Sequence, residues 1–546
     1  MRYIDLEHQF FGRQDIVKLL KKRISDLKEG FRQNVAILGN PFIGKTAFLK
    51  NFVFNIDDDS VTPIYLELDR DKDKSYVYHK FFGSLLYHYL KSNNSSIEED
   101  EDFLIEKAQE TIPQTVQVIK KIKADISIGK YKDSFLGLLS LPDIYINETG
   151  KCCVLIFDEF QNLEEILGEH VFQDLGKKIM TQKKCFYIFA SSYKTVAERI
   201  LSEKLSLLFG NFEIVSLGAF DLKTSQEFIE HHLQDVLAGA QLRHFLTDFT
   251  GGHPLYLNLI CKELVNLSAV YKQNEIYMPL LSQAVENTIF NRWGVISRHF
   301  ELIVLDLCQG KDNRVVSSLL ISLANGKNKI DDIIADVAFS KLKVRSKIKD
   351  LLEKSILVKN GQHYYFQDKL FKYWVRYVYQ KRLHDVDLSQ EKQKKEFKEE
   401  FARSMDAIRI SAGQDFSARI VDLLHCFDDE SFDLNGRKYR LPVFEEVTSF
   451  KLKNDNGTFL DVIKAIGNNE TWLIALKKEN VGEGDIQTAL SYAKQLGVRP
   501  DRCVLVALTD IEDTTRLKAL QEKFWIWNEG ELNTLLTIFD KPYIIR

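Results

Sequence analysis

The residues with the clearest chemistry in this 546-residue chain are residues 39–46, GNPFIGKT. They directly follow an apolar run, and a strand, a glycine loop and a helix start in this order form a phosphate cradle. The glycines let backbone N–H groups turn toward phosphate oxygens, Lys45 brings positive charge to the β- and γ-phosphates, and the Thr46 hydroxyl can ligate Mg²⁺. We therefore predict a nucleoside triphosphate site made of Gly39, Asn40, Pro41, Phe42, Ile43, Gly44, Lys45, Thr46 and Ala47.

A pair of acids forms the second chemical group. Residues 153–157 are continuously apolar and end in Asp158 and Glu159. Such a run is typical of a buried parallel strand with acids at its carboxyl end. In phosphate-loop enzymes an acid there holds Mg²⁺, usually through water, and an adjacent glutamate can orient the attacking water. We assign Asp158, with Thr46, to the metal and Glu159 to the base.

A pair of serines ends another apolar run. Residues 185–190 lead into Ser191 and Ser192, polar groups where a γ-phosphate sensor would lie in such a sheet. We place Ser191 in the catalytic set with Lys45 and Glu159. Serines at this position can also cap the next helix, and the two roles can coexist.

The elements that must position these residues alternate between strands and helices. Apolar runs predict strands at residues 34–38 and 63–68 and around the acid and serine pairs, and a helix at residues 46–54. Residues 71–150 are mainly helical in pattern and contain the acidic run 98–102, which we expect to be a solvated linker. This alternation indicates an α/β fold with a parallel sheet.

Length and composition bound the rest of the chain. At 546 residues it is too long for one core, and 45% hydrophobic residues indicate folded domains throughout. No apolar run reaches the length of a membrane span and the N-terminus lacks a signal-peptide layout, so we expect a cytoplasmic protein with no membrane partner. Seven cysteines without a Cys-x-x-Cys pair favour buried thiols, and a net charge of −4 restricts nucleic-acid binding to a local patch.

From residue 221 to about 289 the pattern is helical and contains TGGHPLYL, residues 250–257. With the Phe-Gly-Arg turn at residues 11–13, the glycine loop, the acid pair and the serine-ended strand, it resembles the archaeal-type ATPases of the STAND class of P-loop NTPases. The resemblance implies an ATP-dependent switch. The Phe-Gly-Arg turn would pack by the adenine, and the His-Pro turn of a helical lid would approach the phosphates. It adds as nucleotide-binding residues Phe11, Gly12, Arg13, His253 and Pro254.

One position departs from that family. The resemblance predicts an arginine in a Leu-Phe-Gly-Arg segment after the serine-ended strand, whereas this chain has Asn211. An arginine that stabilises transition-state charge is worth about 10³ to 10⁵ in rate, so we expect slow hydrolysis. Arg199, on the preceding helical segment, is a candidate substitute.

Residues 298–385 show three short helical patterns and then a hairpin around Asn360 and Gly361, which indicates a winged helix-turn-helix. The helix before the hairpin has an apolar and a basic face. We expect its core residues to be Leu342, Val344, Ile348 and Leu351. We expect its outward, phosphate-binding candidates to be Lys341, Arg345, Lys347 and Lys349. The module can bind DNA or serve as an internal packing element, and the sequence favours neither. The aromatic stripe at residues 368–377 is expected to be core.

A charged helical linker, residues 386–400, leads to a last α/β part that resembles the restriction-endonuclease-like fold in its order of helix, three strands, helix and strand. Nucleases of that family need an acid on one strand and Glu-x-Lys on the next, because two carboxylates hold the metal. Asp461 and Lys477 match, but Ala475 replaces the glutamate, so we expect a degenerate, non-cleaving fold. Glu445 or Glu446 could take the missing role, which leaves cleavage open.

The expected domains are a P-loop ATPase domain (1–220), a helical lid (221–297), the winged helix-turn-helix (298–385), the linker (386–400) and the endonuclease-like domain (401–546). The leading hypothesis is an ATP- and Mg²⁺-dependent switch that hydrolyses ATP slowly and controls the winged helix and the C-terminal module. The alternatives are a DNA-binding protein with a vestigial ATPase and an ATP-gated, Mg²⁺-dependent nuclease. A protein partner, or self-association through the ATPase domain, is possible. No motif names the activating signal.

Overall fold

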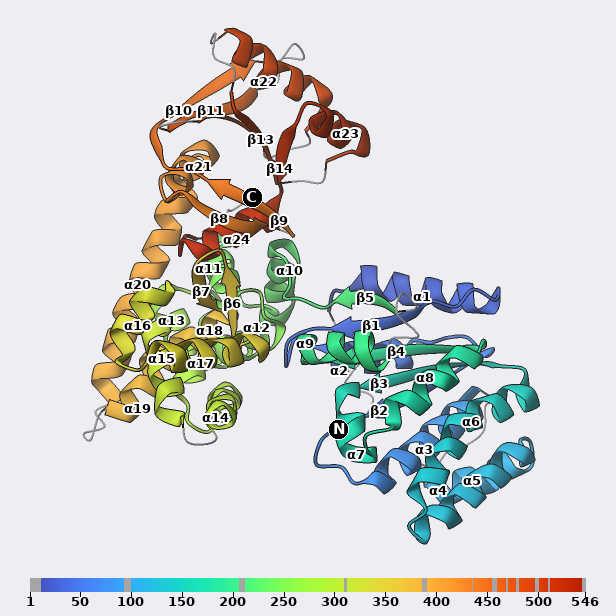
Figure 1. Ribbon diagram of the computed structural model, residues 1–546. Coiled ribbons are helices and arrows are strands. Elements are labelled where there is room, and N and C mark those ends of the chain that lie inside the picture. The colour runs from blue at the N-terminus through green and yellow to red at the C-terminus, as the bar shows by residue number, and fades with distance from the viewer. Residues whose placement is uncertain are drawn as a thin grey trace. The chain divides into compact units, whose positions relative to one another are not determined.

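The computed structural model describes residues 11–92, 100–205, 212–308, 312–384, 390–434, 436–453, 459–467, 470–477, 481–495, 500–508 and 511–542. The chain forms two compact units, Met1–Phe220 and Asp221–Arg546, and each is described by itself. Figure 1 colours the chain from blue at the N-terminus to red at the C-terminus. In the described ranges, no helix combines the length and the apolar character that crossing a bilayer requires.

The first unit is built on a sheet of five parallel strands, in the order β2-β3-β4-β1-β5. Its strands are β1 (Asn34–Leu38), β2 (Val61–Glu67), β3 (Cys152–Asp158), β4 (Cys185–Ser191) and β5 (Phe212–Ser216). The predicted parallel sheet is confirmed. β1, β3 and β4 are buried along their whole length, which explains their continuously apolar sequences. β5 was missed because it is a partly exposed edge strand with a weaker apolar pattern.

Helices cover both faces of this sheet (Figure 1). One face packs against α1 (Gln14–Lys28) and α2 (Lys45–Phe54). The other face packs against a larger helical layer made of α3 (Lys74–Ser92), α4 (Glu101–Gln109), α5 (Pro113–Ser127), α6 (Tyr131–Thr149), α7 (Leu163–Leu167) and α8 (Val171–Thr181). Helices α3 to α6 fill the segment that was predicted to be mainly helical. α9 (Lys194–Arg199) follows β4.

The register of the parallel strands brings the chemical residues to one edge. Leu38 lies opposite Ser191, and Asp158 lies opposite both Glu67 and Ala190. The carboxyl ends of parallel strands meet at the same edge of a sheet. The glycine loop, the acid pair and the serine pair therefore begin side by side, although more than a hundred residues separate the first from the second.

The acidic run 98–102 is wrong as a solvated linker over its described residues. Asp100 is the N-cap of α4, where its carboxylate accepts a hydrogen bond from the Phe103 N–H at 2.9 Å. The next two acids form the first turn of the same helix. Acids are favourable there because the helix dipole is positive at the N-terminus, so the charges start a helix instead of extending the chain. Residues 98 and 99 lie outside the described part.

The second unit begins with α10 (Leu222–Leu233), α11 (Ala240–Thr250), α12 (Pro254–Tyr271), α13 (Met278–Phe290) and α14 (Val295–Leu307). It continues with α15 (Asn313–Ala324), α16 (Ile330–Val337), α17 (Lys341–Glu353) and the antiparallel strands β6 (Leu357–Asn360) and β7 (His363–Phe366). The predicted hairpin is confirmed, and the winged-helix assignment stays a prediction. Next come α18 (Lys369–Trp374), a π-helical turn (Val375–Tyr379) and α19 (Gln380–His384). Phe371 and Trp374 are buried, so the aromatic stripe is core, as predicted.

One predicted core residue of α17 is wrong. Leu342 is 83% exposed, whereas Val344, Ile348 and Leu351 are buried. The buried residues are four and three positions apart and share one helix face. Leu342 lies two positions before Val344, about 200° around the helix, and therefore points away from the core.

The β6–β7 hairpin is packed against a second hairpin, β8 (Glu430–Leu434) and β9 (Arg437–Leu441). The Asn360 side chain donates to the Asp433 carbonyl at 2.7 Å and accepts from the Asp433 N–H at 2.6 Å. The buried His363 ring lies 2.8 Å from the buried Glu430 carboxylate. The tip of the β6–β7 hairpin is thus part of the interior contact with β8.

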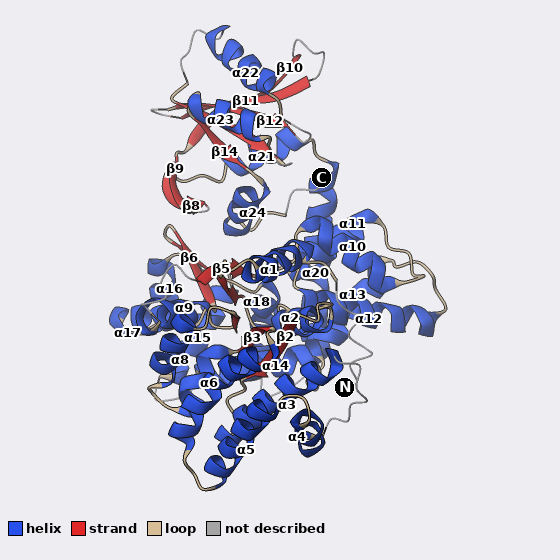
Figure 2. Ribbon diagram, turned by 90° about the vertical axis from the view of Figure 1, so that its right-hand side faces the viewer, coloured by secondary structure: helices blue, strands red, loops and turns tan. Residues whose placement is uncertain are grey.

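A second five-stranded sheet forms the C-terminal part, in the order β10-β11-β12-β13-β14. β10 (Phe444–Lys453), β11 (Phe459–Gly467) and β12 (Thr471–Lys477) are antiparallel, and β13 (Arg502–Ala507) and β14 (Phe524–Trp527) run parallel to β12. One face packs against α21 (Phe416–Leu424) and α24 (Glu529–Ile538). The other packs against α22 (Glu483–Gln495) and α23 (Asp513–Gln521), which Figure 2 shows beside the strands. The predicted strands are confirmed, and the endonuclease-like assignment stays a prediction.

Helix α20 (Gln390–Gly413) runs through the predicted boundary between the linker and the last domain. Its aromatic side is buried: the ring of Phe401 lies 4.7 Å from that of Phe245 on α11, and the ring of Phe397 lies 5.5 Å from that of Tyr377. The charged residues therefore form one face of an amphipathic helix, and this segment is packed rather than a solvated spacer.

Replacing Phe401 by alanine tests this packing. Phe401 is 2% exposed, and Ile410 on the same helix is 63% exposed. Removing a buried phenylalanine typically costs about 3–5 kcal/mol, so F401A should lower the unfolding temperature by several degrees. I410A is the matched control and should unfold like the wild type. Calorimetric scans of the full chain measure both, and a wild-type scan for F401A would contradict the packing.

Candidate active site

The glycine loop joins β1 to α2 at the carboxyl edge of the parallel sheet. A Cβ atom on Gly39 would lie 2.4 Å from the Leu217 carbonyl oxygen, and the Gly39 N–H donates to the Ser191 carbonyl at 3.2 Å. Gly44 is the N-cap of α2, with φ 98°, a left-handed conformation that glycine adopts without strain. The loop is therefore held against the sheet edge and begins α2 where helix N–H groups can bind phosphate oxygens.

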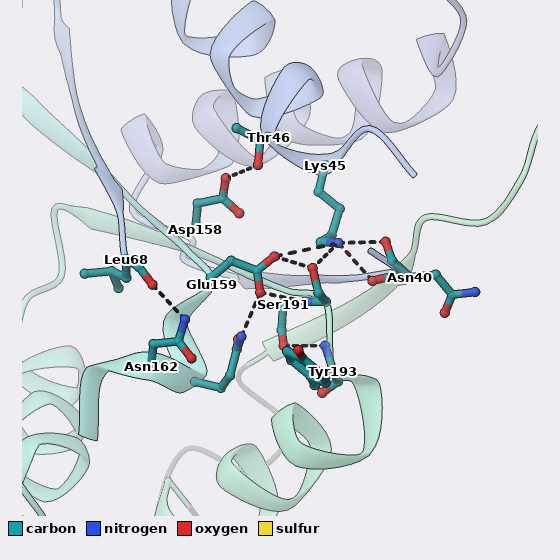
Figure 3. A network of polar contacts seen from close by, with 12 residues as sticks. Asn40, Lys45, Thr46, Leu68, Asp158, Glu159, Asn162, Ser191 and Tyr193 are labelled. Carbon is teal, nitrogen blue, oxygen red and sulfur yellow. Dashed lines mark hydrogen bonds and ion pairs between the residues drawn. The ribbon is translucent and has the colours of Figure 1, made fainter. Parts of the chain in front are cut away.

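Lys45 is only 4% exposed although it carries a charge. Its ammonium donates to the Gly39 and Asn40 carbonyls, each at 2.9 Å, and to the Ser192 hydroxyl at 2.8 Å (Figure 3). The Glu159 carboxylate lies 3.9 Å away. Burial lowers the pKa of Lys45, and the nearby carboxylates oppose that shift. An ammonium has three donors, so a phosphate must replace one or more of these partners.

Asp158, at the end of β3, is fully buried and has an asymmetric set of partners. Its Oδ2 accepts hydrogen bonds from the Thr46 hydroxyl at 2.6 Å and from the Tyr65 hydroxyl at 2.9 Å. Its Oδ1 is buried and has no hydrogen-bond partner among the described residues. Burial raises the pKa of Asp158, and the hydrogen bonds from Thr46 and Tyr65 oppose that shift.

These oxygen atoms fit Mg²⁺. The ion prefers oxygen ligands, and a buried carboxylate oxygen without a partner is costly unless a metal or its water satisfies it. Thr46 can offer a hydroxyl lone pair to the metal while its hydrogen stays on Asp158. No group of three or more His, Cys, Asp or Glu side chains poised to hold a metal occurs in the described residues. This agrees with magnesium, which keeps waters and phosphates as most of its ligands.

Glu159 follows Asp158 in a left-handed backbone conformation, φ 55°, which is uncommon for residues other than glycine. Its carboxylate accepts hydrogen bonds from the Ser192 hydroxyl, from the Ser192 N–H at 3.0 Å and from the Gln161 side chain at 2.7 Å. To take a proton from water as a general base, it must exchange at least one of these partners.

Ser192, rather than Ser191, contacts the charged residues. Its hydroxyl accepts from Lys45 and donates to Glu159. The Ser191 hydroxyl accepts from the Tyr193 N–H at 3.1 Å and so closes the turn before α9. The catalytic role of Ser191 stays a prediction, and Ser192 is the contact that was missed. Adjacent residues of a strand point in opposite directions, but two serines in a row carry no signal for which one faces the site.

The predicted adenine-binding residues lie together near the end of β5. Gly12 and Arg13 have φ values of 77° and 63°. The Arg13 guanidinium donates to the Gly218 carbonyl and lies 4.7 Å from the centre of the Phe220 ring. The Phe11 ring is 6.4 Å from the same ring. These residues form an aromatic and basic cluster, and its contact with adenine stays a prediction.

The predicted lid residues start a helix in the second unit. His253 is the N-cap of α12 and Pro254 is its first residue. The His253 ring stacks on Tyr256 with centroids 4.0 Å apart, and the Tyr256 hydroxyl donates to Asp368, the N-cap of α18. The His-Pro turn is therefore linked to the helix after the β6–β7 hairpin. Contact of His253 with phosphates stays a prediction.

The predicted phosphate-binding cations of α17 are placed unequally. Lys341, Arg345 and Lys349 are exposed at four-residue spacing. Lys341 lies 3.8 Å from Asp331, and Lys349 lies 3.7 Å from Glu353. Lys347 is half-buried and pairs with Asp350 at 3.0 Å, because it precedes the core residue Ile348 and lies beside the buried face.

Asp461 and Lys477 lie on opposite faces of the C-terminal sheet. Asp461 is opposite Leu476 in the register of β11 and β12, so Lys477, the next residue, points to the other face. There its ammonium lies 2.5 Å from the buried carboxylate of Asp485 on α22. The structure does not bring the two predicted nuclease residues together, and the partner of Lys477, Asp485, was missed.

No second carboxylate joins Lys477 from the neighbouring strands. The positions beside it on the same face are Leu460, Val462 and Ala475, all buried and apolar. Glu445 and Glu446 are on β10, which β11 separates from β12. Two carboxylates near one lysine, the requirement for metal-dependent cleavage, do not occur among these described residues.

The parallel sheet with helices on both faces, the glycine loop between β1 and α2, and the acid at the end of β3 define the first unit as a P-loop NTPase fold. No family model matches the chain, and no curated protein matches it by sequence.

Solved structures that are similar to the chain include three nucleotide-related proteins. A Walker-type ATPase of Pyrococcus abyssi is 14% identical, with 67% of this chain and 96% of that chain covered and a TM-score of 0.44. The Aeropyrum pernix ORC2 protein, in ADPNP–ADP complexes, is 11% identical, with 69% and 96% covered and a TM-score of 0.44. The Thermotoga maritima RuvB Holliday junction branch migration motor is 13% identical, with 67% and 96% covered and a TM-score of 0.34. At this level of similarity, the roles of individual residues rest on the geometry above.

Replacing Gly39 by alanine tests the close approach of the loop. The added Cβ would lie 2.4 Å from the Leu217 carbonyl oxygen, so the loop must move. Relieving such a contact costs about 1–3 kcal/mol, and we expect ATP affinity to fall by about tenfold or more. G83A, in the middle of α3 with open space around the new methyl group, is the control. Calorimetric titration with ATP compares them, and equal affinities would contradict the described loop geometry.

Proposed function

We propose that the chain is an ATP-binding P-loop ATPase that hydrolyses ATP slowly and acts as a molecular switch. One observation carries the proposal: Lys45, Thr46, Asp158 and Glu159 converge at the carboxyl edge of a parallel sheet, beside a glycine loop. Positive charge for phosphates, oxygen ligands for a metal and a carboxylate base are the groups that phosphoryl transfer to water requires.

Each residue has a role that follows from its contacts. Lys45 exchanges loop carbonyls for the β- and γ-phosphates, and the N–H groups at the start of α2 bind phosphate oxygens. Thr46 and the free oxygen of Asp158 hold magnesium directly or through its water. Magnesium, when bound, supplies charge that offsets the charge of the phosphates. Glu159 orients a water and accepts its proton after it leaves Ser192.

Slow turnover follows from two features. Glu159 is engaged by Ser192 and Gln161 and must release a partner before it can act on water. The arginine that the family resemblance implies is replaced by Asn211, which lies outside the described residues. Arg199 is exposed at the end of α9 and stays a candidate substitute.

The switch role is supported by the way the second unit is connected. The Tyr256–Asp368 hydrogen bond links the His-Pro turn to α18, and the β6–β7 hairpin is fixed to β8 by the pairs Asn360–Asp433 and His363–Glu430. A movement of the proposed lid would therefore be passed to the winged helix and on to the C-terminal sheet. A protein partner or a second copy of the chain could receive this change.

A second candidate function is DNA binding through α17. The favouring observation is the exposed row of Lys341, Arg345 and Lys349 on one helix face. Cations spaced in this way can follow a phosphate backbone. The nearby acids Asp331 and Glu353 reduce the net charge of the row, so we rank this function below the ATPase.

Two substitutions test the ATPase. K45A removes the buried cation and should abolish ATP binding in a calorimetric titration, because nothing else in the loop supplies positive charge to the phosphates. E159Q keeps the shape and should retain binding while turnover falls by about 10²–10⁴-fold, the usual contribution of a general base. Phosphate release measures turnover. ATP affinity retained by K45A would overturn the site, and full turnover by E159Q would overturn the base.

The DNA proposal has its own test. K341A/R345A/K349A should weaken duplex binding and reduce its salt dependence, since each lost phosphate contact releases fewer counterions. K18A/K21A/K22A removes the same charge from exposed positions on α1 and is the control. Fluorescence anisotropy at several salt concentrations gives the slopes. An unchanged slope for the α17 variant removes the proposal.

A further inference from the structure

We infer that Tyr65 is a positioning residue, which holds the Asp158 carboxylate in the orientation that binds magnesium. The inference rests on the proposed ATP site. It adds to that site a residue from β2, which carries neither the glycine loop nor the acid pair.

The hydrogen bonds on Asp158 carry the inference. A carboxylate can rotate about its Cβ–Cγ bond, so a single donor does not decide which oxygen faces the site. Here the same oxygen, Oδ2, receives Thr46 at 2.6 Å and Tyr65 at 2.9 Å. These donors come from α2 and β2, on different sides of the carboxylate, and together they fix its plane. Oδ1 is left buried, with no hydrogen-bond partner in the described part of the chain.

Tyr65 is itself held in place, which a positioning residue requires. It is 7% exposed, and its ring is part of the core between the sheet and helices α1 and α2. Its backbone N–H donates to the Ser84 hydroxyl at 2.9 Å. The Lys50 ammonium lies 5.7 Å from the ring centre and pairs with Glu67 at 2.8 Å. The phenol therefore reaches Asp158 from a rigid base.

The role differs from that of Thr46. The Thr46 hydroxyl is expected at the metal, so its bond to Asp158 changes when the metal is bound. Tyr65 lies behind the carboxylate and touches it only through Oδ2. Partners of this kind orient metal-binding groups, and their loss typically costs about 10–100-fold in metal affinity.

The experiment measures magnesium dependence of ATP binding, not only activity. ATP is titrated calorimetrically into the full chain at a series of Mg²⁺ concentrations and in EDTA. For Y65F we expect ATP affinity in EDTA like that of the wild type, and a magnesium midpoint that is about 10–100-fold higher. Direct titration with Mn²⁺, followed by its paramagnetic signal in the presence of ATP, gives the same comparison without turnover.

A matched control separates positioning from loss of a buried hydroxyl. Tyr145 is buried and its hydroxyl bonds to Thr62, at the other end of β2, at 2.7 Å. Y145F removes a comparable hydrogen bond from the same strand and should leave the magnesium midpoint unchanged. All titrations are made below the unfolding temperature of the least stable variant.

A double variant completes the test. In D158N there is no carboxylate to orient, so Y65F/D158N should have the same magnesium midpoint as D158N. A Y65F midpoint within twofold of the wild type overturns the inference, and so does an additive effect in the double variant. If the wild type itself binds no ATP, the proposed function fails instead, so the two failures are distinguishable.

Discussion

A buried lysine is the charge around which the carboxyl edge of the first sheet is arranged. Lys45 is removed from water, and such a cation is stable only when its donors are used and negative charge is near. Loop carbonyls, a serine hydroxyl and Glu159 meet that need. The loop must therefore lie close against the strand ends, which explains why Gly39 has no room for a side chain.

The second unit depends on a different constraint, the interior contact between two hairpins. His363 and Glu430 are both buried, and Asn360 exchanges two hydrogen bonds with the Asp433 backbone. Buried polar groups of this kind are costly unless paired, so the two hairpins stabilise one another. The β6–β7 hairpin is thus a structural connector, and any contact of this region with DNA would fall to the exposed face of α17.

Much of the fold and site could be predicted because the signals are local. The glycine loop and the acid pair each lie directly after a buried strand, and a parallel sheet then brings them to one edge. The errors have physical reasons. Leu342 is apolar but lies off the face of Val344, the acids at 100–102 start a helix, and β5 is an edge strand with a weak apolar pattern. Charged residues concealed the buried aromatic side of α20.

The chain's own pattern was sufficient for the phosphate loop, the metal acid and the order of strands, because each depends on neighbours in the sequence. Contacts between distant segments were decided only by packing. These include Ser192 instead of Ser191 beside Lys45, Tyr65 behind Asp158, and Asp485 instead of Asp461 beside Lys477. Strand register and the direction of each side chain depend on which strands become neighbours, and residue spacing along the chain does not contain that information.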